Sequence, residues 1–99
     1  MDKQTAIKRL LAGETIEYAE GGNSMTPLIK SREPIILAPV PEGHTFKRGQ
    51  IVFVRVRGNI YTHKISAVEK DRVQISNNHG HVNGWTMKSN VYGIYIGKA

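Results

Sequence analysis

Two short stretches of the sequence carry residue types that could do chemistry. Residues 22–27 (GNSMTP) place the hydroxyl of Ser24 on a turn led by glycine, and residues 61–65 (YTHKI) place His63 beside Lys64. A serine hydroxyl is a poor nucleophile until a base accepts its proton, and a histidine with the ordinary pKa of about 6.5 can do so at neutral pH. The first stretch offers a nucleophile and the second a base, provided that the fold brings them together.

Both residues also have a purely structural interpretation. Ser24 lies between Gly22 and Pro27, a composition that suffices for a turn serine. His63 lies in a strand-like segment, where a half-buried histidine can bond to the backbone. The choice depends on the elements that position the two side chains.

Those elements belong to one small domain, residues 1–99, with enough apolar residues for a single core. The chain has no cysteine, so packing and backbone pairing must stabilise it. The net charge of +6 suits a soluble protein and leaves room for an acidic partner. No stretch approaches the roughly 20 apolar residues of a membrane-spanning helix. We therefore expect a cytoplasmic protein with no membrane partner.

The pattern predicts one helix followed by short strands. Asp2 can cap a helix within residues 1–13, which Gly13 ends, and its apolar face is formed by Ala6, Ile7, Leu10 and Leu11. Gly58-Asn59 is a two-residue hairpin signal, and residues 77–84 form a polar loop. Expected strands are residues 14–20, 34–38, 51–56, 60–68, 73–76, 85–88 and 91–96. Residues 14–99 are thus expected to form an all-β, barrel-like core behind one N-terminal helix.

The order of these segments resembles the LexA/signal peptidase superfamily of serine peptidases. The resemblance covers residues 18–97 and consists of GxSMxP at 22–27, KRGQIV at 47–52, YTHKI at 61–65, the Asn/Gly-rich loop and VYG at 91–93. It implies a mainly β fold of coiled antiparallel sheets and an extended peptide or protein as the substrate. No metal or other cofactor is expected.

The resemblance also assigns roles to single residues. Ser24 matches the nucleophile that ends a strand, and Met25 matches the neighbour that shapes the substrate groove. The base matches His63 and not Lys64, as in the Ser-His, archaeal and endoplasmic-reticulum signal peptidase branch. The oxyanion is expected to be held by a backbone N–H or a hydroxyl near Ser24, and Asn23 and Ser24 are the candidate donors.

The sequence departs from the family pattern where acids are expected. Residues 48–50 read RGQ where relatives carry Lys-Gly-Asp, and the loop at 76–84 (SNNHGHVNG) holds no carboxylate. An asparagine can accept a hydrogen bond from the histidine, but it cannot stabilise the imidazolium by charge. Two functions follow: a serine endopeptidase with a Ser24/His63 dyad, or a catalytically inactive domain of the same fold that binds protein or nucleic acid. A chain this compact also suits a phage gene.

Two further patterns each have two interpretations. His79 and His81 form a His-x-His that could bind a metal, or they are exposed loop histidines, since no third ligand is nearby. A basic stripe could bind single-stranded nucleic acid, or it is the solvated face of a sheet. The stripe consists of Arg48, Arg55 and Arg57, with Tyr61 and Trp85 available for stacking.

Overall fold

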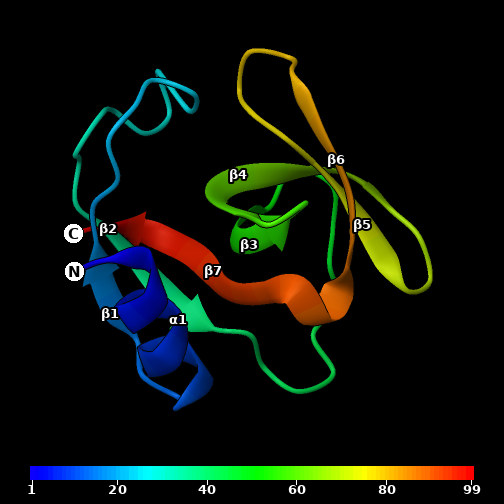
Figure 1. Cartoon of the computed structure of the whole chain (residues 1–99), viewed down its shortest axis with the longest axis horizontal. Coiled ribbons are helices and arrows are strands. Elements are labelled where there is room, and N and C mark those ends of the chain that lie inside the picture. The colour runs from blue at the N-terminus through cyan, green and yellow to red at the C-terminus, as the bar shows by residue number, and fades with distance from the viewer.

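Seven antiparallel strands in one sheet and one short helix make up the fold (Figure 1). The computed structural model describes residues 1–99. The elements are α1 (Lys3–Leu11), β1 (Ile16–Tyr18), β2 (Ile35–Pro39), β3 (Ile51–Val56), β4 (Asn59–Val68), β5 (Arg72–Ser76), β6 (Val82–Met87), the short 3₁₀ helix η1 (Lys88–Asn90) and β7 (Val91–Lys98). The prediction of a mainly β protein with one N-terminal helix is confirmed.

The sheet has the strand order β1-β2-β7-β3-β4-β5-β6 and is not closed, so β1 and β6 are its edges. In Figure 1, β7 (orange to red) crosses the molecule and links the part that holds α1, β1 and β2 to the part that holds β3 to β6. Both termini lie at the α1 end. The curled sheet thus provides two connected halves.

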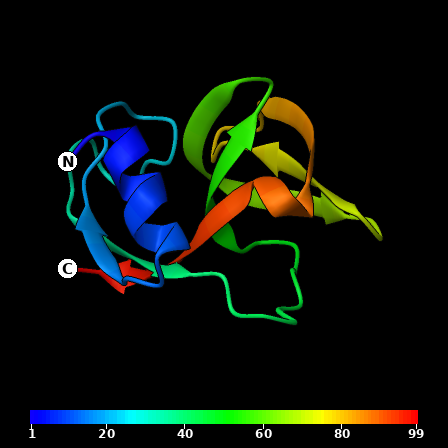
Figure 2. The ribbon, with the colours of Figure 1, turned by 60° about the horizontal axis from the view of Figure 1, so that its bottom comes forward.

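The helix α1 begins and ends as its sequence indicates. The side chain of Asp2 accepts a hydrogen bond of 2.7 Å from the Thr5 N–H, and Gly13, at φ +89°, follows the last turn. The apolar residues that α1 buries are Ala6, Ile7 and Leu10. Leu11 is 69% exposed, because it lies next to Leu10 and so points about 100° around the helix from it. Figure 2 shows α1 packed beside β1, β2 and β7.

The apolar residues form two clusters, where the sequence had predicted a single core. Side chains alternate along β3, so Phe53 packs into the cluster next to α1, while Val52 and Val54 pack into the other. The α1-side cluster consists of Ala6, Ile7, Leu10, Ile16, Tyr18, Met25, Ile29, Ile35, Leu37, Phe53 and Ile60. The second consists of Val52, Val54, Val56, Ile65, Val73, Ile75 and Val91. Because the curled sheet covers both faces of β3, that strand is buried on both sides.

Two local predictions were wrong. The β3–β4 hairpin turns at Arg57-Gly58 and not at Gly58-Asn59: Val56 pairs with Asn59, and φ is +50° at Arg57 and +82° at Gly58. A two-residue hairpin of this kind needs positive φ at both central residues, and glycine supplies the second. The loop after β5 also ends before residue 84, because β6 begins at Val82. This earlier start places Asn83 in a strand.

Candidate active site

Ser24 lies in a turn after β1 and does not end a strand, contrary to the prediction. The strand β1 ends at Tyr18, and Gly22, at φ +107°, adopts a backbone conformation that other residues rarely take. Ser24 is half-buried. Its turn belongs to no sheet ladder, so other contacts must fix its position.

The loop between β5 and β6 supplies those contacts. The backbone N–H of Asn78 donates to the Ser24 carbonyl oxygen at 2.8 Å, and the Asn78 side-chain amide donates to the Thr26 carbonyl oxygen at 2.9 Å. His79 Nε2 lies 2.9 Å from the Asn23 carbonyl oxygen, to which it donates. These three hydrogen bonds, together with a contact of 3.1 Å between Thr26 Oγ1 and His79 Nε2, attach the serine turn to residues 78 and 79.

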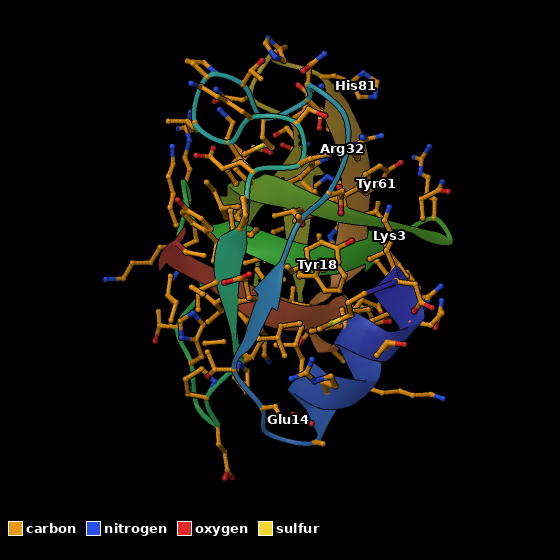
Figure 3. The ribbon with its side chains drawn as sticks, turned by 90° about the vertical axis from the view of Figure 1, so that its left-hand side faces the viewer. Lys3, Glu14, Tyr18, Arg32, Tyr61 and His81 are labelled. Atoms are coloured by element: carbon orange, nitrogen blue, oxygen red, sulfur yellow. The ribbon has the colours of Figure 1, made fainter.

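His63 lies within hydrogen-bond reach of the serine. It belongs to β4, which pairs with β3 and β5, and only 4% of its surface is exposed. The His63 Nε2 atom is 3.0 Å from Ser24 Oγ. The ring stacks on Tyr61, with 4.5 Å between ring centroids and 15° between planes. Figure 3 shows Tyr61 on β4, below the two loops that carry Arg32 and His81 in that view.

Asn83 contacts the other nitrogen of the same ring. Its Oδ1 lies 2.7 Å from His63 Nδ1. Since an amide oxygen can only accept, Nδ1 carries the proton and Nε2 is left as an acceptor for the Ser24 hydroxyl. The three side chains form one directed chain of hydrogen bonds, in which Ser24 donates to His63 and His63 donates to Asn83.

Burial lowers the pKa of His63, and the hydrogen bond to Asn83 partly opposes that effect. The lowered pKa keeps the ring neutral at neutral pH. A neutral imidazole with a free Nε2 lone pair can accept a proton from a serine hydroxyl. The electrostatics of the site therefore suit a general base.

Backbone N–H groups lie unused beside Ser24. Those of Asn23, Ser24 and Met25 donate no hydrogen bond within the protein, although the Asn23 carbonyl oxygen accepts several. The side chain of Asn23 is exposed. Unpaired N–H groups next to a nucleophile can stabilise an oxyanion that forms there. The geometry thus leaves Asn23 and Ser24 as the candidate donors.

A narrow pocket adjoins the serine on the α1 side. It is lined by Ser24, Met25, Thr62 and the carboxylates of Glu20 and Glu33, among others. Its volume of about 20 Å³ holds about one water molecule. Met25 is buried in the α1-side cluster and forms part of the pocket wall.

The structure separates Lys64 from the pair. Neighbouring residues of a strand point to opposite faces, and the Lys64 ammonium lies 3.4 Å from Asn78 Oδ1. The residue that the sequence had not singled out is Asn83. The sequence feature that pointed to it was the composition of residues 76–84, which contain several amides and no carboxylate. That composition did not indicate which amide would contact His63.

The basic stripe is not arranged as predicted. Arg57 lies in the hairpin turn and so does not share a strand face with Arg55, whose Nε donates to the Tyr92 hydroxyl at 2.9 Å. A β-carbon built on Gly84 would lie 3.2 Å from Arg57 Nε, so Arg57 lies against β6. The aromatic partners are also engaged: Tyr61 stacks on His63, and the Arg72 guanidinium lies 4.4 Å from the centre of the Trp85 ring.

In comparisons with known proteins, no family model, curated protein or solved structure matches the chain. The resemblance to the LexA/signal peptidase superfamily therefore stays a prediction from the ordered sequence motifs. The nine-residue α1 is too short and too polar to span a membrane, and no other helix of the structure meets the requirement.

Proposed function

We propose that the protein is a small serine endopeptidase of the LexA/signal peptidase type. The observation that carries the proposal is the directed chain from Ser24 through His63 to Asn83, with distances of 3.0 and 2.7 Å. Such an arrangement is what a serine needs in order to lose its proton during attack. Ser24 is the nucleophile, His63 is the base, and Asn83 orients the ring.

The residues present account for each step of peptide hydrolysis. Ser24 Oγ attacks the substrate carbonyl carbon as His63 Nε2 takes the hydroxyl proton, and N–H groups beside Ser24 bind the oxyanion. His63 then returns the proton to the leaving amine, and the C–N bond breaks to leave an acyl-enzyme. Water, deprotonated by His63, attacks the ester and releases the acid and Ser24.

An edge strand next to the pair can bind the substrate. The strand β6 pairs only with β5, so its outer backbone groups are available to an extended peptide, and it contains Asn83. A peptide added there would run beside the side chain that orients His63. The substrate is therefore an extended, unfolded segment.

A serine-reactive fluorophosphonate probe tests the proposal. We expect labelling of the wild type at Ser24, confirmed by mass spectrometry, and loss of labelling in Ser24→Ala and His63→Ala. Ser89→Ala removes an exposed serine on η1 and is expected to keep the label. Folded wild type that takes up no label between pH 6 and pH 9 would overturn the proposal.

A second candidate is a domain of the same fold that binds an extended peptide without cleaving it. The amide at Asn83, where a carboxylate would stabilise the imidazolium, favours this candidate. It predicts peptide binding at the β6 edge in wild type and in Ser24→Ala alike, with no labelling of either. The fluorophosphonate experiment therefore separates the two candidates.

A further inference from the structure

A second pocket, of about 290 Å³, lies beside Lys64, away from the Ser24 pocket. Its polar lining consists of Arg48, Lys64, Ser66, Ser76, Asn77 and the backbone of Gly80. None of its nine lining residues is acidic. Two cations without a counter-charge make the pocket electropositive.

The positions of the two cations are set by the sheet and by a turn attached to it. Lys64 pairs directly with Ser76 in the β4–β5 ladder, so their side chains share one face. The Gly49 N–H donates to the Ile65 carbonyl oxygen at 2.8 Å, and the Ile65 N–H donates to the Gln50 carbonyl oxygen at 2.8 Å. These bonds fix the turn that carries Arg48 against β4, next to Lys64.

Ser76 is the most unusual residue of this pocket. The residue is only 3% exposed and lines the pocket, and no buried polar side-chain atom of the protein lacks a hydrogen-bond partner. Since the Ser76 hydroxyl is not bonded to another group of the protein, it reaches the open space of the pocket, where a ligand can bond to it. Ser66 differs, because its hydroxyl is bonded to Gln74.

We propose that this pocket binds a phosphate-type oxyanion. Arg48 and Lys64 supply charge, the Ser76 hydroxyl donates a hydrogen bond, and a tetrahedral dianion can contact all three groups at once. A single carboxylate carries half the charge and fewer acceptor atoms. The site does not depend on Ser24 chemistry, since neither Ser24 nor His63 lines it.

Titration of the ¹⁵N-labelled protein with inorganic phosphate tests the site, with chloride at matched ionic strength as the reference. We expect saturable shifts of the Gly49, Ser76, Asn77 and Gly80 amides that chloride does not produce. Lys64→Gln and Arg48→Gln should each weaken binding about tenfold, and Ser76→Ala roughly threefold to tenfold. Lys70→Gln removes an exposed cation outside the pocket and should leave the affinity unchanged.

A parallel titration with O-phosphoserine identifies the source of the ligand. Binding of both compounds, or of phosphoserine alone, assigns the pocket to a phosphate monoester, and binding of phosphate alone assigns it to the free anion. Equal shifts with phosphate and chloride, or unchanged binding in Lys64→Gln and Arg48→Gln, would overturn the proposal. If Lys64→Gln fails to fold, Arg48→Gln decides alone, because Arg48 is exposed in a turn.

Discussion

Asn83 presents its amide oxygen to His63 Nδ1 at 2.7 Å, the place from which a carboxylate would stabilise a protonated ring. We predict that Asn83→Asp raises the pKa of His63 and increases the rate of fluorophosphonate labelling at Ser24 by about tenfold or more. The added negative charge favours the imidazolium that forms as Ser24 attacks. Histidine ring NMR signals followed against pH, and labelling rates at pH 8, measure the two effects.

Asn83→Leu is the control for that change, because it keeps a side chain of similar size and removes the hydrogen bond. It should slow labelling below the wild-type rate, since the ring is then free to adopt the wrong tautomer. Equal rates in wild type, Asn83→Asp and Asn83→Leu would mean that Asn83 does not act on His63 during the reaction.

The free energy of unfolding should fall as the pH drops below about 6.5. In the unfolded chain, His63 takes up a proton near its ordinary pKa of 6.5, whereas burial lowers the pKa of His63 in the folded protein. The unfolded state therefore binds more protons in this range, and the stability present above pH 6.5 is lost toward the folded-state pKa. Urea unfolding at several pH values from 7.5 to 5 measures the slope.

The variant His63→Gln supplies the reference for that slope. It lacks the titrating ring but keeps the other three histidines, so its stability should change less between pH 7.5 and pH 5. The range lies above the ordinary pKa values of the carboxylates, which limits their contribution. Parallel pH profiles for the two proteins would contradict the assignment.

Gly93→Ala should destabilise the protein by about 1–3 kcal/mol. A β-carbon at Gly93 would lie 2.8 Å from Leu10 Cδ1 and 3.2 Å from the carbonyl oxygen of Ala38. Leu10 is only 2% exposed, so its side chain has little room to move. The matched control is Gly21→Ala, where the nearest atom would be Ser31 Oγ at 4.0 Å and the expected change is within about 0.5 kcal/mol. Urea midpoints of the two variants measure the difference.

Asp2→Ala should lower the free energy of unfolding, because the Thr5 N–H loses its capping acceptor. Asp2→Asn keeps an acceptor at the same place and should cost less. The comparison is made by urea unfolding at pH 7. A loss in Asp2→Asn equal to that in Asp2→Ala would assign the effect to charge at the helix N-terminus and not to the hydrogen bond.

Local patterns predicted α1 and most strands because those elements depend on neighbouring residues. Asp2, the helical spacing and Gly13 define α1, and the β-branched residues of β3 define a strand whatever surrounds it. The hairpin turn was misplaced by one residue because Gly58 accounts for a turn in either register. The actual register places Arg57 at a positive φ that its residue type does not favour.

Only the part of the site that lies in the ordered motifs could be predicted from the sequence. The ordered motifs indicated Ser24 and His63 as a pair, but nothing local to residues 76–84 distinguishes Asn83 from Asn77 and Asn78. The choice is made by the irregular register between β5 and β6, where Ile75 pairs with Gly84 and Ser76 with Val82. Such a bulge depends on pairing between strands and leaves no clear trace in one strand's sequence.

The attachment of the serine turn to the loop after β5 has a consequence for the order of folding. Ser24 and His63 are 39 residues apart, and the bond from Asn78 to Thr26 spans 52 residues. Contacts this distant in sequence form only after much of the chain entropy has been lost. A nascent chain is therefore expected to hold no reactive serine until residues 78–83 have been synthesised and have docked, so labelling of Ser24 would count only fully folded molecules.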